Sequence, residues 1–262
     1  MAKLKAASLK KGGLEELEPC LAVDFPVLDY PAAWQLQTRL VEMRHLGRLG
    51  HDVLLTLEHP PVMTVGRRGL DNDLLVPEST LAEQGISLHR IERGGLITYH
   101  GPGQLIIYPI FDLRACGLRL TEFVQGLEEI MLRIAADFGV RAQREESNRG
   151  VFAQGRKLGS LGVAVRRGVT FHGLALNVNV DLAPFQLITP CGLAGIHMTS
   201  LALESEVEVD MAEVRRSALD HLSRVFHREC RCVSAKQLID FAELELESDD
   251  ISSPSPWQAP LA

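Results

Sequence analysis

Apolar residues recur at helical spacing in four stretches of the chain. The clearest stretch has seven of them at intervals of mostly three or four, with Thr121 as a candidate N-cap and Gly139 where a helix commonly ends. Proline opens the first stretch, and the last two begin with pairs that resemble a capping box. Helices are therefore expected over 31–49, 121–138, 211–227 and 235–246.

Short runs rich in Val, Ile and Leu lie between these stretches and are separated by Gly, Pro and Asn. They predict strands over 53–57, 62–65, 86–91, 96–99, 105–110, 150–154, 158–165 and 169–178, with 199–204 as a further candidate. Helices and strands do not alternate regularly, which argues against a doubly wound parallel sheet. The expected fold class is α+β (α/β): a single domain in which helices pack on a mixed, mostly antiparallel sheet.

The domain is expected to span 21–246. A flexible segment is expected at 1–20, and an acidic tail with a Ser-Ser-Pro-Ser-Pro run, expected to be disordered, at 247–262. With 27 Lys+Arg against 34 Asp+Glu, the net charge of −7 argues against non-specific binding of nucleic acid. Five irregularly spaced cysteines form no disulfide framework, and no stretch is apolar enough to span a membrane. We expect a cytoplasmic protein that binds neither nucleic acid nor membrane.

Glycine and polar residues are concentrated in 93–104, where four glycines fall within a few positions of Arg93, Tyr99 and His100. Two hairpin turns would explain the glycines alone. Glycine also allows a backbone to approach a ligand closely, and the polar neighbours favour this second interpretation. The segment is therefore a candidate binding wall.

Two further residues are candidates for chemistry. If 158–165 is a strand, Lys157 shares its more apolar side with Leu161 and points inward, unless it snorkels to the surface. Cys191 lies between Pro190 and Gly192, which favours a loop, although a free cysteine is more often a buried packing residue. A nearby ammonium would lower the pKa of the thiol, so the two form a candidate nucleophile and base.

Other motifs are weaker. His227, Cys230 and Cys232 lack the spacing of a structural zinc site, so no metal is expected. His172 fits a core position better than a ligand position, and no phosphate-binding loop is present.

Three segments together resemble the lipoyl(octanoyl) transferase family: RGGLITYHGPGQLIIYPI at 93–110, GRKLGSLGVAVRRGVTFHGLALNVNVDLAPF at 155–185, and ITPCGLAG at 188–195 followed by Thr-Ser-Leu. The likeness extends over about 25–230. It implies a fold like that of biotin and lipoate protein ligases. It also implies octanoyl transfer from acyl carrier protein to a lysine of lipoyl domains, without a cofactor. The implied acceptors are 2-oxoacid dehydrogenase complexes and the glycine-cleavage H protein.

By position, the resemblance places the acyl-thioester cysteine at Cys191 and the lysine that lowers its pKa at Lys157. The implied substrate-binding residues are Arg93, Gly94, Gly95, Leu96, Ile97, Thr98, Tyr99, His100, Ser160, Leu161, Gly162, Gly173, Leu174 and Ala175. Leu96 and Ile97 stand where many relatives are more polar, and Ile196-His197-Met198 stands where an acidic residue is common. These departures put the acyl-chain preference in question, but they leave the cysteine and lysine in place.

The sequence leaves two other functions open. An ATP-dependent lipoate or biotin protein ligase would share the fold without a catalytic cysteine, and a non-catalytic module would only bind acyl groups or lipoyl domains. Because the expected protein partners are acidic, Arg67, Arg68, Arg166 and Arg167 are candidate docking residues.

Overall fold

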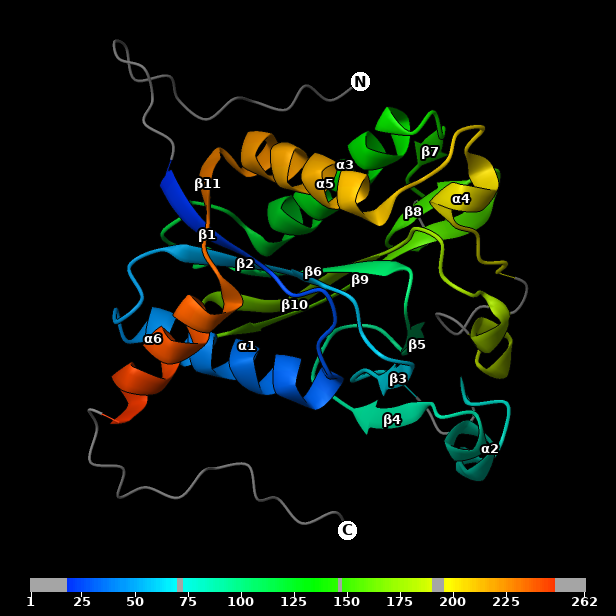
Figure 1. The fold of residues 1–262 in the computed structure, drawn as a ribbon, viewed down its shortest axis with the longest axis horizontal. Coiled ribbons are helices and arrows are strands. Elements are labelled where there is room, and N and C mark those ends of the chain that lie inside the picture. Colours follow the sequence, from blue (N-terminus) through cyan, green and yellow to red (C-terminus); the bar gives the residue numbers. More distant parts are fainter. Residues whose placement is uncertain (1–17, 70–72, 146–147, 190–195, 248–262) are drawn as a thin grey trace.

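An eight-stranded sheet forms the centre of the molecule (Figure 1). The computed structural model describes residues 18–69, 73–145, 148–189 and 196–247. Across the sheet the strands are β11 (Arg228–Cys232), β1 (Glu18–Asp24), β2 (Asp52–Leu57), β6 (Gln104–Ile110), β10 (Val169–Asn177), β9 (Arg156–Arg166), β8 (Val151–Ala153) and β7 (Ala142–Gln143). The first three are parallel, and each neighbouring pair from β2 to β7 is antiparallel. The predicted mixed, mostly antiparallel sheet is confirmed.

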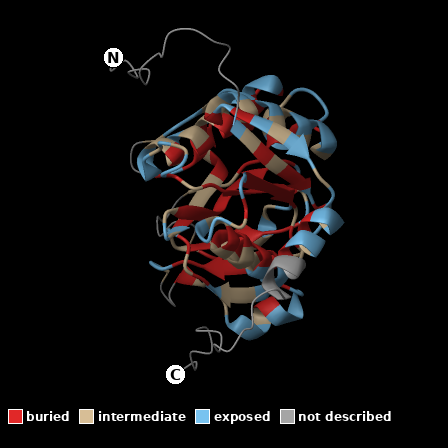
Figure 2. Cartoon of the chain, turned by 90° about the vertical axis from the view of Figure 1, so that its left-hand side faces the viewer, coloured by how far each residue is buried: buried red, intermediate tan, exposed pale blue. Residues whose placement is uncertain are grey.

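The central strands are buried on both faces, as every residue of β2, β6 and β10 is buried. Successive side chains of a strand point to opposite faces, so neighbouring residues of β6 belong to different cores. Leu105 and Ile107 pack in one hydrophobic cluster, whereas Ile106 and Tyr108 pack in another. Figure 2 shows the buried sheet between layers whose outer surfaces are exposed.

Helices cover both faces of the sheet (Figure 1). α3 (Leu120–Asp137) and α5 (Met211–Phe226) lie on one face, and α1 (Tyr30–His45) and α6 (Ala235–Glu247) lie on the other. All four predicted helices are confirmed. Thr121 is not the N-cap of α3: Arg119 occupies that position, and its backbone N–H donates to the Glu122 carboxylate at 2.9 Å. Gly139 follows the helix with φ +74°, as expected.

A second, three-stranded sheet has the order β4 (Ser87–Arg90), β3 (Val62–Val65) and β5 (Ile97–His100). The sequence predicts these strands but not their separation from the main sheet. They pack with α2 (Glu78–Glu83) and the 3-10 helix η2 (Ala183–Leu187) around Met63 and Tyr99. The Gly94 N–H, which donates to the Val163 carbonyl oxygen of β9 at 3.1 Å, joins the two sheets.

Three local features differ from the sequence analysis. The candidate strand at 199–204 is wrong, since α4 (Leu201–Glu204) forms there. Residues 18–20 belong to β1, which pairs with β2 and β11, although they were assigned to the N-terminal segment. β1, β7 and β11 were not predicted, because two are short or polar edge strands and Glu18-Pro19 obscures the start of the third. Residues 1–17 and 248–262 lie outside the described part of the chain.

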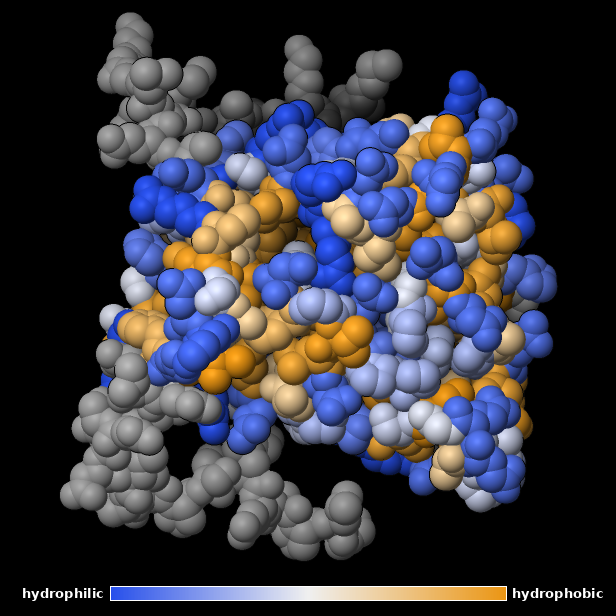
Figure 3. Space-filling model, in the orientation of Figure 1, coloured by the Kyte–Doolittle hydropathy of each residue, from blue (hydrophilic) through white to orange (hydrophobic). Residues whose placement is uncertain are grey.

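None of the described helices combines the length and the apolar composition that a membrane crossing requires. On the face drawn in Figure 3, hydrophilic side chains are spread widely, with hydrophobic patches between them.

Candidate functional site

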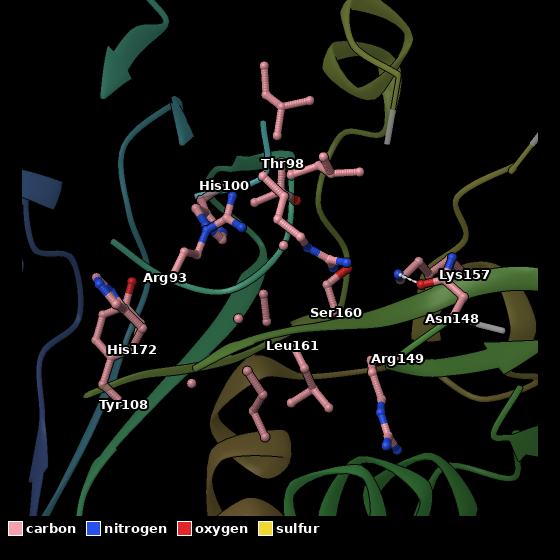
Figure 4. A pocket seen from close by; sticks show the side chains of 18 of the residues that line it. Arg93, Thr98, His100, Tyr108, Asn148, Arg149, Lys157, Ser160, Leu161 and His172 are labelled. Carbon is pink, nitrogen blue, oxygen red and sulfur yellow. Dashed lines mark hydrogen bonds between the residues drawn. The ribbon is translucent and has the colours of Figure 1, made fainter. Parts of the chain in front are cut away.

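A cavity of about 390 Å³ lies between the glycine-rich segment that leads into β5 and the strands β9 and β10 (Figure 4). Twelve of the fourteen expected substrate-binding residues line it: Arg93, Gly95, Leu96, Ile97, Thr98, His100, Ser160, Leu161, Gly162, Gly173, Leu174 and Ala175. Lys157 also lines the cavity. The fold thus brings three separate sequence segments to one pocket.

Gly94 and Tyr99 do not line this cavity. Gly94 makes the backbone contact between the sheets, and the Tyr99 ring lies edge-on to Phe185, with ring centroids 5.4 Å apart. Gly94 thus joins the wall to β9, and Tyr99 packs in the core of the small sheet. Gly95 has φ +92°, a backbone conformation that favours glycine.

The pairing of β9 with β10 builds the floor of the pocket. Ser160 pairs with Ala175, Leu161 with Leu174, and Gly162 with Gly173. Glycine is required at 173, since a Cβ there would lie 2.1 Å from the Ile107 carbonyl oxygen. The floor therefore combines an apolar pair with places where the backbone packs closely.

Lys157 is 1% exposed and lies at the start of the β9 part of the floor. Its Nζ donates to Asn148 Oδ1 at 2.8 Å and lies 5.5 Å from the centroid of the Phe152 ring. Its backbone N–H donates to the His197 carbonyl oxygen at 2.8 Å, and its own carbonyl accepts from the Thr199 N–H at 2.9 Å. Of the two orientations left open by the sequence, the structure has the inward one.

Cys191 lies outside the described residues, within 190–195. The described chain reaches Thr189, whose N–H donates to the Asp73 carbonyl oxygen at 2.7 Å. It resumes at Ile196, next to the residue whose carbonyl contacts Lys157. The pairing of Cys191 with Lys157 thus stays a prediction.

Six further residues line the cavity and were not predicted to do so: Tyr30, Arg68, Tyr108, Asn148, Arg149 and His172. The sequence predicts a core position for His172 and only a docking role for Arg68. Asn148 and Arg149 precede β8 in a segment without periodicity. No pattern in the sequence distinguishes them, and the one available signal is that they lie shortly before Lys157 in the chain.

The end of the pocket far from Lys157 is polar. There the His59 Nδ1–H donates to the Leu28 carbonyl oxygen at 2.6 Å, and His59 Nε2 accepts from the Tyr108 hydroxyl at 2.8 Å. His100 Nδ1 contacts Gln104 Oε1 at 2.7 Å. Burial lowers the pKa of His59 to about 4 and that of His100 to about 3, so these imidazoles are neutral at neutral pH.

Arg93 is 7% exposed and fixes the glycine-rich wall to the small sheet. Its Nη2 donates to the Thr64 carbonyl oxygen at 2.6 Å, and its Nη1 donates to the Gly94 carbonyl oxygen at 2.9 Å. The side chain also passes close to the floor, since a Cβ on Gly162 would lie 2.7 Å from Arg93 Cδ. Arg93 therefore shapes the pocket as well as lining it.

The pocket lies between the two sheets of one α+β domain. The sequence model described as the lipoyl protein ligase A/B catalytic domain matches residues 29–223. An octanoyltransferase of Desulfotalea psychrophila is 49% identical over 206 residues, which cover 78% of this chain and 92% of that protein. An octanoyltransferase of Acidobacterium capsulatum is 43% identical over 214 residues, covering 76% and 87%. The chain belongs to the lipoyl(octanoyl) transferase family.

Solved structures are similar in fold. Lipoate-protein ligase A bound with ATP superposes with a TM-score of 0.65 at 18% identity, covering 91% of this chain and 97% of that one. A bi-partite lipoate protein ligase from Thermoplasma acidophilum gives a TM-score of 0.63 at 18% identity, covering 90% and 95%. The expected ligase-like fold is confirmed.

Proposed function

We propose that this chain is an acyltransferase that moves an octanoyl group from acyl carrier protein to a lysine of a lipoyl domain. The names of its relatives support this reaction. The observation that carries the proposal is the burial of Lys157 at one end of a pocket whose floor is the apolar pair Leu161 and Leu174. The apolar floor gives an acyl chain a surface to pack against. Acyl transfer also needs a group that accepts and returns a proton, and Lys157 lies at the end of that floor.

The reaction has two halves. In the first, the Cys191 thiolate attacks the carbonyl carbon of the octanoyl thioester, and the carrier thiolate leaves and takes up the proton that Cys191 gave to Lys157. In the second, the amine of the acceptor lysine attacks the enzyme thioester. Its proton passes to Lys157, and the Cys191 thiolate leaves as the amide forms. A thiol suits both halves because it is a good nucleophile and a good leaving group.

The position of Cys191 in the chain supports its pairing with Lys157. Cys191 is six residues before His197, whose carbonyl oxygen accepts the hydrogen bond from the Lys157 N–H. Six residues are a short tether, so the chain allows the thiol and the ammonium to meet.

The apolar floor favours a medium acyl chain, since each buried CH₂ stabilises binding by about 0.8 kcal/mol. The acceptors we propose are the lipoyl domains of 2-oxoacid dehydrogenase complexes and the glycine-cleavage H protein. The cytoplasm is the proposed location, a prediction that rests on the irregular spacing of the five cysteines. The domain limits of 21–246 likewise stay a proposal, with residues 18–20 and Glu247 added because they belong to β1 and α6.

Of the four arginines that the sequence offers as docking residues, the structure favours Arg68. Arg166 pairs with Glu92 at 3.0 Å and Arg167 with Glu42 at 2.9 Å, so nearby carboxylates already offset their charges. Arg68 is exposed and lines the pocket. We propose Arg68 as the first contact for an acidic carrier protein.

Intact-protein mass spectrometry tests the function. After incubation with octanoyl-acyl carrier protein and no ATP, the protein should gain one octanoyl group in place of one hydrogen. Cys191→Ser should abolish the gain, and a lipoyl domain added later should remove it from the wild type. Transfer that requires ATP would indicate a ligase instead, and binding of the carrier without any adduct or turnover would indicate a non-catalytic module.

A further inference from the structure

Asn148 lies at the Lys157 end of the pocket and is 9% exposed (Figure 4). Its Oδ1 accepts a hydrogen bond from Lys157 Nζ at 2.8 Å. An ammonium group can only donate, so this contact determines which amide atom faces it. The oxygen faces Lys157, and the NH₂ group is left for another partner.

That NH₂ group has no partner. Asn148 Nδ2 is buried and makes no hydrogen bond within the part of the chain that the structure describes. Most buried polar atoms in folded proteins are paired, and an unpaired donor calls for an explanation. Because this donor lies in the wall of a substrate pocket, the simplest explanation is that its acceptor is an atom of the substrate.

The floor of the pocket indicates which substrate atom that is. Leu161 is four residues along β9 from Lys157, and a strand rises by about 3.3 Å per residue, so the two Cα atoms are about 13 Å apart. An eight-carbon chain laid against Leu161 and Leu174 reaches back toward Lys157 with its carbonyl end. This placement rests on the function proposed above.

We propose that the Asn148 Nδ2–H group donates a hydrogen bond to the acyl carbonyl oxygen and stabilises the negative charge that develops there. When a nucleophile bonds to the carbonyl carbon, the π pair of the C=O bond moves onto the oxygen. When the intermediate collapses, that pair re-forms the double bond and the thiolate leaves. Asn148 keeps its proton throughout. The same oxygen carries the charge in both half-reactions, so one donor serves both.

The segment that carries Asn148 is held in place from two sides. The Gly150 N–H donates to Glu128 Oε1 of α3 at 3.2 Å, and Glu128 is 2% exposed. Gly150 has φ +123°, and a Cβ on it would lie 2.2 Å from the Gly159 carbonyl oxygen of β9. A donor fixed before the reaction stabilises a transition state better than one that must reorient.

Asn148→Asp and Asn148→Leu together test the proposal, since both remove the N–H donor. The aspartate keeps an oxygen for Lys157 but adds a negative charge beside it, whereas the leucine adds no charge, so both variants must lose rate. We expect kcat to fall about 10²–10³-fold across the whole pH range, the usual effect of losing one such donor. Binding of an octyl pantetheine thioether, which lacks the thioester carbonyl and does not react, should stay within about twofold of wild type. Asn148→Ala should lose as much rate. Asn179→Asp makes the same atomic change at an exposed position outside the pocket and should change neither quantity.

Full turnover by Asn148→Asp would overturn the proposal, because the acceptor for Lys157 alone would then suffice. A variant that only shifts the basic limb of the pH profile and keeps its plateau would also overturn it, since the effect would act through Lys157. Weakened thioether binding in step with the rate would point to a damaged pocket and would count against the proposal. The wild-type protein separates this from failure of the proposed function: without octanoyl transfer by the wild type, the function itself fails.

Discussion

Two buried cations, Arg228 and Lys157, have different surroundings. Arg228 donates to the Asp52 carboxylate at 3.1 Å and to Cys116 Sγ at 2.8 Å, and the other oxygen of Asp52 accepts from Arg44 at 3.2 Å. Lys157 donates to the neutral amide of Asn148 and faces a cavity. The first group of residues, which we call the Asp52 cluster, contains its own counter-charge and lines none of the pocket.

The comparison shows that contact with a cation does not make a thiol reactive. The Cys116 thiol touches a guanidinium, yet burial and the Asp52 charge raise its pKa to about 12. It therefore keeps its proton at neutral pH. Lys157 donates to a neutral amide and lines the pocket, so it is a better candidate than Arg228 for lowering the pKa of a reactive thiol.

The largest expected effect separates the two cations. Lys157→Met keeps most of the length of the side chain and removes the ammonium, so kcat should fall about 10³-fold while the protein stays folded. Lys236→Met, at a position 82% exposed, is the control and should keep its rate. Steady-state octanoyl transfer and thermal unfolding measure both effects. If Lys157→Met kept full turnover, the assignment of Lys157 to catalysis and of Arg228 to structure would be wrong.

Asp52→Asn should show the reverse behaviour. It leaves Arg44 and Arg228 without their shared carboxylate, so the free energy of unfolding should fall by about 3–5 kcal/mol. Activity per folded molecule should not change. Urea denaturation measures the loss, with the half-exposed Asp240→Asn as control. If Asp52→Asn lowered kcat and left the stability unchanged, the Asp52 cluster would not be purely structural.

The same variant tests why the Cys116 thiol keeps its proton. Removing the Asp52 charge should lower the pKa of Cys116, and alkylation of Cys116 by iodoacetamide at pH 8 should become faster. An unchanged rate would mean that burial alone suppresses this thiol.

Like the Asp52 cluster, the buried histidines near the far end of the pocket should affect the stability of the fold, in their case as a function of pH. Burial lowers the pKa values of His59, His100 and His172 to about 4, 3 and 3, below the 6.5 of an unfolded histidine. The unfolded chain therefore binds more protons below pH 6.5, and stability falls as the pH drops from 6.5 toward 4. Each histidine contributes a slope of about 1.4 kcal/mol per pH unit. His59→Gln should reduce the slope measured by urea denaturation at pH 5–6.5, and the exposed His51→Gln should not.

The smallest effect concerns the surface. Arg68→Glu should raise KM for the carrier protein about fivefold at low salt and less at high salt, because exposed charges are screened. Arg167→Glu should change KM less, since Glu42 already pairs with that arginine. Initial rates at two ionic strengths measure both. Equal effects of the two substitutions would remove Arg68 as a specific contact.

The sequence predicts the parts of the fold that repeat locally. The helix α3 follows from its apolar periodicity, and β6 and β10 follow from their Val, Ile and Leu content. The N-cap of α3 at Arg119 does not follow from the sequence pattern, because Arg119 and Glu122 are an uncommon capping pair. The separate small sheet does not follow either, since which strand pairs with which depends on contacts distant in sequence.

The site divides in the same way. By resemblance, the sequence alone places Lys157 and twelve residues of the pocket lining, because the motif residues are contiguous and carry unusual glycines. The tertiary structure alone brings Asn148 to Lys157 and Tyr108 to the far end of the pocket. It also determines which buried polar groups are paired and which, like Asn148 Nδ2, make no hydrogen bond within the described residues. Local pattern encodes backbone conformation, whereas pairing and burial depend on which distant segments the folded chain brings together.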